Sequence, residues 1–106
     1  MPNYLVTYHG NGAPPASPEA MEQIHAAFAA WVASVGDGMV DPGAPLAAAK
    51  SVSSGGTNDG PASGRLAGYT IVKASDLDSA VQLVTTHPFV ARGGTLTVNE
   101  AVNLGG

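Results

Sequence analysis

Three histidines, His9, His25 and His87, are the side chains in this sequence best suited to move a proton near neutral pH. His25 follows Ile24 and precedes Phe28 by three positions, which places it at the edge of an apolar helix stripe. From that edge it could point into a pocket between helix and sheet, where a neutral imidazole can act as a general base. The alternative is a half-buried histidine whose ring bonds to the backbone.

Asp41 is the carboxylate that could orient His25. It precedes Pro42, which holds it extended, and it follows the connection from the first predicted helix to the next strand. A carboxylate within hydrogen-bond reach would fix the tautomer of the imidazole. An Asp before Pro-Gly is also typical of a turn, and this second interpretation is favoured by the local sequence.

His87 stands directly before Pro88, which cannot continue a helix. At the last turn of a helix the negative end of the dipole favours an imidazolium, and the ring can bond carbonyl groups that lack helical partners. This structural role is favoured for His87. A ligand-binding role is the alternative, because residues at the ends of elements often contact ligands.

His9 lies on the same side of its strand as Leu5 and Thr7. It could join Thr70, or Thr97 and Asn99, if these polar positions share one face of the sheet. Such a face suits a small polar ligand, and it equally suits a wet dimer interface.

Two aromatic residues complete the candidate ligand-binding set, which is His9, Trp31, Tyr69 and His87. Trp31 and Tyr69 are expected in the core or in an interface, with a place in a pocket wall as the second interpretation.

No metal or cofactor site is predicted. The three histidines fall on separate predicted elements without a local i, i+4 pair, and the chain has no cysteine. No nucleophile signature, dinucleotide-binding glycine motif or phosphate loop is present in the sequence.

Composition limits the classes of partner. The chain has 106 residues and a formal net charge of −4. Because this length is typical of one domain, a single domain is predicted over residues 1–106. Its four cations form no cluster, so nucleic-acid binding is not expected. The longest apolar run, Ala26 to Ala33, is far shorter than the ~18 residues of a membrane span, and no signal peptide is recognised. We therefore expect a soluble cytoplasmic protein without membrane contact.

The elements that must position these residues follow from local signals. A strand is predicted over Asn3 to His9, and a helix from Pro18 with Ser17 as its N-cap and Gly36 as its stop. Beyond it we predict a short extended piece at 39–41, a Pro-Gly turn at 42–43 and a strand over about 46–52. The stretch 53–64 is almost entirely Ser, Gly, Thr, Asn, Asp and Pro, and is predicted to form no element.

A strand follows in "LAGYTIVKA", then a helix in "SDLDSAVQLVTTH" capped by Ser75, and a last strand in "GTLTVNEAV". This order, βαββαβ, predicts an α+β, ferredoxin-like fold with two helices on one face of an antiparallel sheet. The strands carry apolar residues on both faces, so the uncovered face needs a partner. A homodimer is expected.

The stretches "GMVDPGAPL", "GYTIVKASDLDSAVQLVTTHPFV" and "GTLTVNEAV" resemble the YCII-related family, which is similar to the DGPF group of small bacterial proteins. The resemblance implies a dimeric α+β barrel, and a helix histidine working with an aspartate; His25 and Asp41 match those two residues. One departure concerns the Asp-Gly-Pro-Phe stretch, because Asp59-Gly60-Pro61 is followed here by Ala62.

The predicted function is a cofactor-free small-molecule enzyme, an acid–base isomerase, lyase or hydrolase acting on a small organic acid or lactone. The alternative is a non-catalytic dimeric module that binds a metabolite or a protein, with an accessory part in gene regulation as one such role.

Overall fold

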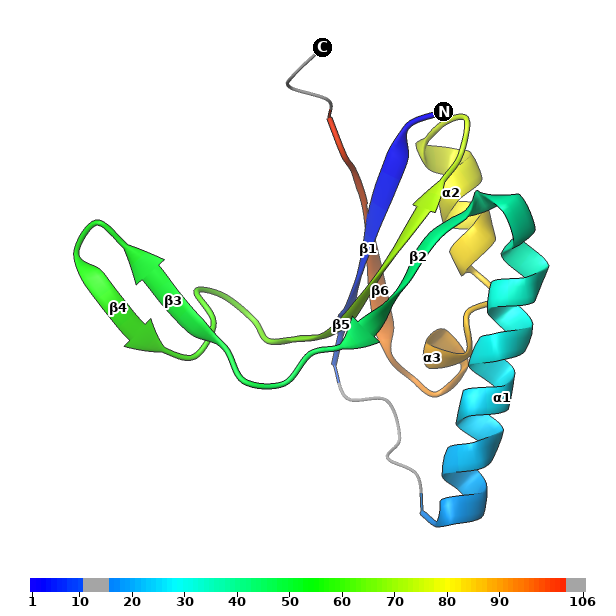
Figure 1. Cartoon of the computed structure of the whole chain (residues 1–106), viewed down its shortest axis with the longest axis horizontal. Helices are drawn as coiled ribbons and strands as arrows, with labels where there is room; N and C mark the ends of the chain where they lie inside the picture. Colours follow the sequence, from blue (N-terminus) through cyan, green and yellow to red (C-terminus); the bar gives the residue numbers. More distant parts are fainter. Residues whose placement is uncertain (11–15, 103–106) are drawn as a thin grey trace.

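The computed structural model describes residues 1–10 and 16–102, and Figure 1 shows the arrangement of its elements. In chain order these are β1 (Asn3–His9), α1 (Pro18–Val35), the 3-10 turn η1 (Gly36–Gly38), β2 (Met39–Pro45), β3 (Lys50–Ser53), β4 (Gly56–Asp59), β5 (Leu66–Lys73), α2 (Leu77–Val84), α3 (Pro88–Ala91) and β6 (Thr95–Glu100). No helix in this described part is long and apolar enough to cross a membrane.

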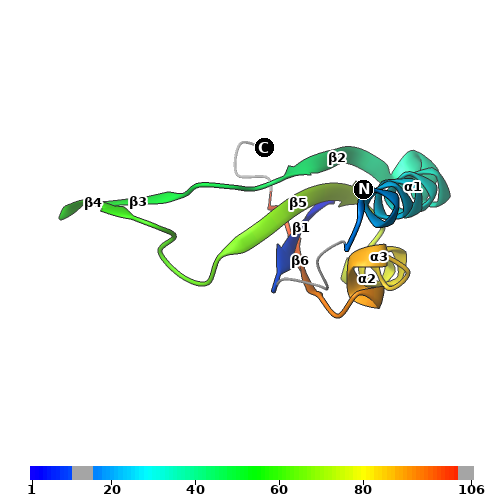
Figure 2. The ribbon, with the colours of Figure 1, turned by 90° about the horizontal axis from the view of Figure 1, so that it is seen from below.

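Four strands form an antiparallel sheet in the order β2-β5-β1-β6. Val6, in the middle of the central strand β1, pairs with Thr70 of β5 on one side and with Val98 of β6 on the other. The helices lie against one face of this sheet (Figure 2). The predicted α+β class and antiparallel sheet are therefore confirmed, and the strand order is compatible with a ferredoxin-like arrangement.

The core lies between the sheet and the helices. Alternate residues of β1 face the helices, and Tyr4 and Val6 are fully buried there beside Val72 of β5. Trp31 of α1 packs into the same cluster, and its indole Nε1–H donates to the carbonyl oxygen of Leu83 at 3.0 Å. This cluster fixes α1 and α2 against the sheet.

The first helix forms as its sequence signals predict. The Ser17 hydroxyl accepts a hydrogen bond from the Ala20 N–H at 3.1 Å, Pro18 occupies the first turn, and the helix ends at Gly36. Gly36 has a φ of 64°, in the left-handed region that favours glycine. These local stop and start signals fix which residues of α1 face the sheet.

The prediction for the segment after α1 is wrong in two respects. The sheet strand is β2 at 39–45 rather than 46–52, and Pro42-Gly43 lies inside that strand instead of forming a turn. The register with β5 shifts twice around Asp41, which identifies an irregularity of the β-bulge type that accommodates the Pro-Gly pair.

The stretch 53–64 differs from its prediction over residues 56–59, which form β4, whereas residues 60–64 form no helix or strand, as predicted. Residues 50–59 form the β3–β4 hairpin, here called the arm, which projects away from the body of the molecule (Figures 1 and 2). Lys50 pairs with Asp59 across it in register and through an ion pair of 3.5 Å. Backbone pairing around the Ser54-Gly55 turn thus outweighs the low strand propensity of these polar residues.

The second helical region is divided in two. Its cap is Asp76, whose carboxylate accepts the Ser79 N–H at 2.7 Å, and not Ser75 as predicted. After α2 ends at Val84, Pro88 begins the short helix α3, with His87 as its N-cap.

Candidate functional site

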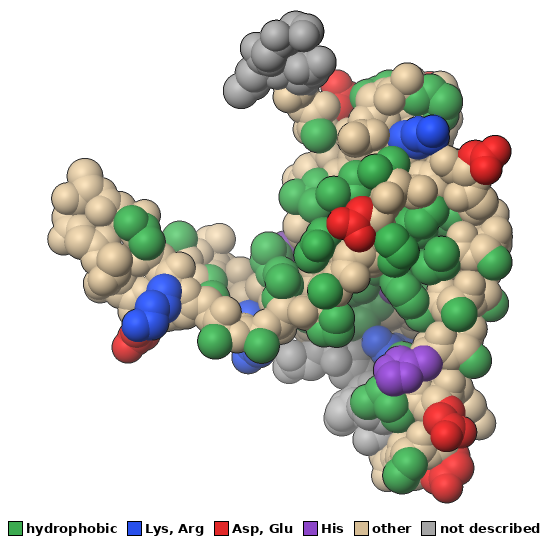
Figure 3. All heavy atoms as spheres, viewed as in Figure 1, with side chains coloured by type: hydrophobic (Ala, Val, Ile, Leu, Met, Phe, Trp, Pro, Cys, Tyr) green, Lys and Arg blue, Asp and Glu red, His purple; other side chains and the backbone are tan. Residues whose placement is uncertain are grey.

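A cavity of about 480 Å³ opens between the first half of α1, the C-terminal end of β2, the N-terminal end of β5, and α3. Hydrophobic side chains gather between α1 and the sheet in the space-filling view (Figure 3). The cavity is lined by Tyr8, Met21, Ile24, His25, Phe28, Pro42, Gly43, Ala44, Pro45, Ala67, Gly68, Tyr69, His87, Pro88, Phe89 and Arg92. Its volume falls in the usual range for small-molecule sites.

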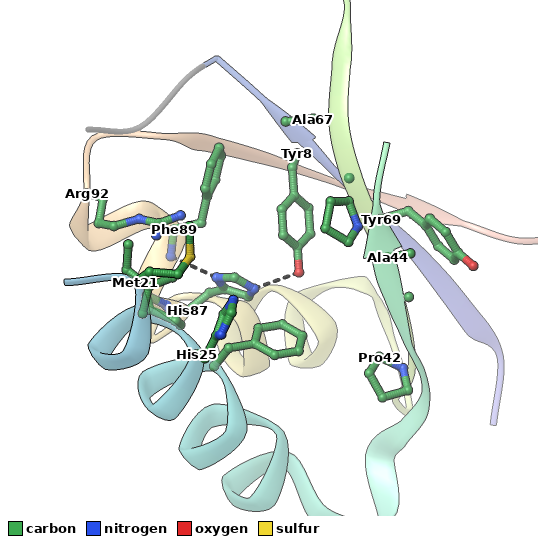
Figure 4. A pocket seen from close by; sticks show the side chains of 16 residues that line it. Tyr8, Met21, His25, Pro42, Ala44, Ala67, Tyr69, His87, Phe89 and Arg92 are labelled. Atoms are coloured by element: carbon green, nitrogen blue, oxygen red, sulfur yellow. Dashed lines mark hydrogen bonds between the residues drawn. The ribbon is translucent and has the colours of Figure 1, made fainter. Parts of the chain in front are cut away.

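A chain of four hydrogen bonds leads from the cavity wall at His87 and Tyr8 to the buried Thr70 and the Pro42 carbonyl, and Figure 4 draws the two bonds that His87 makes. The Phe89 N–H donates to Nδ1 of His87 at 2.9 Å, and Nε2 of His87 lies 2.7 Å from the Tyr8 hydroxyl. Tyr8 in turn lies 2.6 Å from the Thr70 hydroxyl, which donates to the Pro42 carbonyl at 2.9 Å.

The two ends of this chain determine the direction of every bond in it. Because Nδ1 of His87 accepts from a backbone N–H, the neutral ring carries its proton on Nε2 and donates to Tyr8. Because the Thr70 proton goes to a carbonyl oxygen, Tyr8 must donate its own proton to Thr70. Each hydroxyl therefore donates once and accepts once.

His87 is neutral in this setting. Its side chain is 3% exposed, with the Trp31 ring centroid 4.4 Å away and the Tyr8 ring 4.9 Å away. Burial lowers the pKa of His87 to about 4, and the positive charge of Arg92 adds to this effect. The predicted imidazolium at a helix C-terminus is therefore wrong: the ring caps the N-terminus of α3.

Tyr8 keeps its proton for the same reason. Burial raises the pKa of the Tyr8 phenol, against the smaller lowering effect of its hydrogen bond with Thr70. The pair of Tyr8 and His87 is thus a fixed polar element in an otherwise apolar wall.

His25 lines the cavity from α1, and its side chain is exposed at the rim (Figure 4). Asp41 is not among the lining residues; its Oδ1 accepts the Gly43 N–H at 2.8 Å, a local contact within the irregular part of β2. Among the described residues no hydrogen bond joins Asp41 to His25. Their pairing stays a prediction.

The remaining predicted ligand residues lie in different places. His9 is on the face away from the helices, where its Nε2 is 2.8 Å from the Thr7 hydroxyl. Thr97 and Asn99 share that face, as predicted, but Thr70 lies on the opposite one.

Neither predicted aromatic presents its ring to the cavity. Trp31 is a core residue, 4% exposed, and does not line the cavity. Tyr69 belongs to the wall, but its ring points away from Tyr8 and His87 (Figure 4).

Sequence analysis missed Tyr8, Phe89 and Arg92 as cavity residues, and it placed Thr70 on the face of His9 rather than behind Tyr8. Tyr8 lies on the same face of β1 as the buried residues Tyr4 and Val6. Because a buried tyrosine hydroxyl usually has a hydrogen-bond partner, the sequence did contain a signal for Tyr8. Its partners come from β5 and from the segment before α3, and only the register of the folded sheet brings them together.

Within residues 1–10 and 16–102, no three His, Asp or Glu side chains lie close enough to hold a metal ion. No protein-family model matches the chain, and no curated protein matches it significantly. Function therefore has to be inferred from the cavity and its side chains.

Proposed function

We propose that the cavity binds a small organic molecule and that His25 acts on it as a general acid or base, the role that the resemblance to YCII-related proteins implies for this histidine, and that the reaction uses no cofactor. The observation that supports this proposal is the exposed imidazole of His25 at the rim of an apolar cavity of about 480 Å³. Small organic acids and lactones fit such a site, because a single imidazole can take a proton from the substrate or from water and then return it to the product or the leaving oxygen.

Tyr8 and His87 have a different part in this proposal. Their protons are already committed within the hydrogen-bond chain, so they shape and orient rather than transfer protons. A role for Asp41 is supported by the resemblance alone. Asp41 would be the carboxylate that orients the His25 ring when a ligand binds.

Replacing His25 tests the catalytic part. In a screen of small lactones and organic acids, His25→Ala should lower kcat by about 100-fold or more, the usual contribution of a general acid or base. His9→Ala, on the opposite face of the sheet, is the matched control and should keep the wild-type kcat. Equal turnover by the wild type and His25→Ala would contradict the assignment.

Binding without turnover is the second candidate. It is favoured by the saturated hydrogen-bond chain, because Tyr8 and His87 have no proton free for transfer, and among the described residues no carboxylate is hydrogen-bonded to His25. In that case a ligand perturbs the cavity resonances in NMR spectra, while no compound of the screen is converted.

We further propose that the subunit is ferredoxin-like and that a second copy covers its open face, forming a dimeric α+β barrel. The open face is the sheet face away from the helices, and carries Leu5, Thr7, His9, Tyr69, Ile71, Thr95, Thr97 and Asn99. Leu5 and Ile71 pair at its centre, and Leu5 is 37% exposed. By register Lys73 and Asp41 also belong to this face, Lys73 at its end and Asp41 on the edge strand β2, so its centre is uncharged. An uncharged centre with a partly exposed apolar pair is suited to pairing with its own copy.

Light scattering over a range of concentrations tests the dimer. The wild type should have the mass of two chains, and Leu5→Lys should have the mass of one, because the charge would be buried without a partner. Val81→Lys is the matched control, since Val81 on α2 is 38% exposed and outside the open face. A wild type with the mass of one chain at every concentration would refute the dimer.

A further inference from the structure

Among the described residues that line the cavity, Arg92 is the only cation and none is acidic. The other lining side chains are apolar except for Tyr8, Tyr69, His25 and His87. In a chain with a net charge of −4, the cavity therefore has a locally positive wall.

The charge of Arg92 has little compensation. Its guanidinium carbon lies 5.5 Å from the centroid of the Phe89 ring, and its buried Nε has no hydrogen-bond partner among the described residues. The one ion pair of the described residues is Lys50–Asp59, on the arm. A half-buried guanidinium without a carboxylate is unusual, since buried charges are normally paired.

The positive charge of Arg92 also acts on His87 in the cavity wall. Its positive charge contributes to the lowered pKa of His87. An anion bound at Arg92 would partly neutralise the positive charge of Arg92, whereas a cationic ligand would add a second positive charge to the cavity.

We propose that the cavity takes a small carboxylate with an apolar body, the carboxylate on the terminal nitrogens of Arg92 and the body against Met21, Ile24 and Phe28. This inference rests on the proposed function and names the ligand class of the same site. The guanidinium fork matches a planar carboxylate in two parallel hydrogen bonds. A phosphate dianion would need more than one cation, and a polar body would lose its hydration against the apolar wall.

Benzoate and its neutral analogue benzamide are the probes, followed in NMR spectra through the Arg92 Nε–H and the backbone amides of Gly68 and Phe89. Benzoate should bind with a Kd of about 1–10 mM, as expected for a ligand of this size, and shift all three signals. Benzamide has the same shape without the charge, and should bind at least about tenfold more weakly.

Two variants separate the local charge from the net charge. Arg92→Gln should weaken benzoate binding at least about tenfold, while Arg65→Gln, which removes an exposed cation outside the cavity, should leave it within about twofold. Arg92→Gln should also abolish the preference for benzoate over benzamide. In the wild type, comparing the affinity for benzoate with the affinity for benzamide tests the same dependence on ligand charge without any substitution.

Equal binding of benzoate and benzamide at the cavity would overturn the carboxylate inference and leave the proposed small-molecule cavity intact. Benzoate binding that Arg92→Gln does not weaken would overturn it as well. Absence of any shift at the three signals would overturn it too. The proposed function fails separately, if His25→Ala keeps full turnover of the compounds that the wild type converts.

Discussion

Lowering the pH from about 7.5 to about 4 is expected to lower the free energy of unfolding by about 3 kcal/mol through His87 alone. The folded pKa of His87 is about 4, below its ordinary value of 6.5. Between these values the unfolded chain binds a proton that the folded chain does not. The stabilisation is therefore complete above pH 6.5, declines as the pH falls, and is lost below about pH 4.

Urea unfolding at a series of pH values measures this slope, and His87→Asn is the variant that isolates it. Asparagine is a good N-cap that can accept the Phe89 N–H, but it does not titrate. The variant should be less stable at neutral pH, because Tyr8 loses its donor, and should have a flatter pH curve. Carboxylates also titrate near the acid end, and they affect both proteins alike.

Parallel curves for the wild type and His87→Asn would show that His87 is not the source of the acid sensitivity, and would contradict the neutral, buried imidazole.

Gly43→Ala is expected to destabilise the fold by about 4 kcal/mol or more, a large part of the stability of a small domain. Gly43 has a φ of 79° inside β2, where a side chain is strained. A Cβ there would also collide with the Tyr69 carbonyl oxygen and lie 2.6 Å from its carbon. Because this neighbour is backbone of the adjacent strand, β2 and β5 would have to separate.

Gly93→Ala is the matched control for this prediction. Gly93 has a φ of 91°, but a Cβ there would meet nothing within 4 Å. It should show the strain of the backbone alone, about 1 kcal/mol, in the same urea experiment. Equal losses in the two variants would mean that the contact with β5 does not decide the effect.

How far the fold can be predicted depends on the range of the signal. Ser17, Pro18 and Gly36 act within one turn of α1, and the structure confirms both of its ends. The strand β2 could not be placed in the same way, because Pro42 and Gly43 are read as a turn unless a bulge is known to admit them. Its location depends on pairing with β5, which is a tertiary contact.

His87 shows the same limit at the candidate site. A histidine before proline fits the end of one helix and the start of another, and the local sequence favours the first. Its role as a buried, neutral cap depends on Tyr8, which is distant in the chain. A pocket-facing position was one of two interpretations for His25, and the structure places His25 in the cavity lining. The sequence could not point to Arg92, because the lack of acidic neighbours in the described cavity wall becomes visible only in the folded chain.

The arm has a consequence for how the chain can fold and vary. The β2–β5 pairing continues to the hydrogen bond between the Leu46 N–H and the Ala67 carbonyl, so the arm is inserted between two adjacent antiparallel strands. A hairpin that closes locally shortens the loop that must close before β2 meets β5. The arm can therefore change in length or sequence at little entropic expense to the sheet, and is the segment where related chains can diverge first.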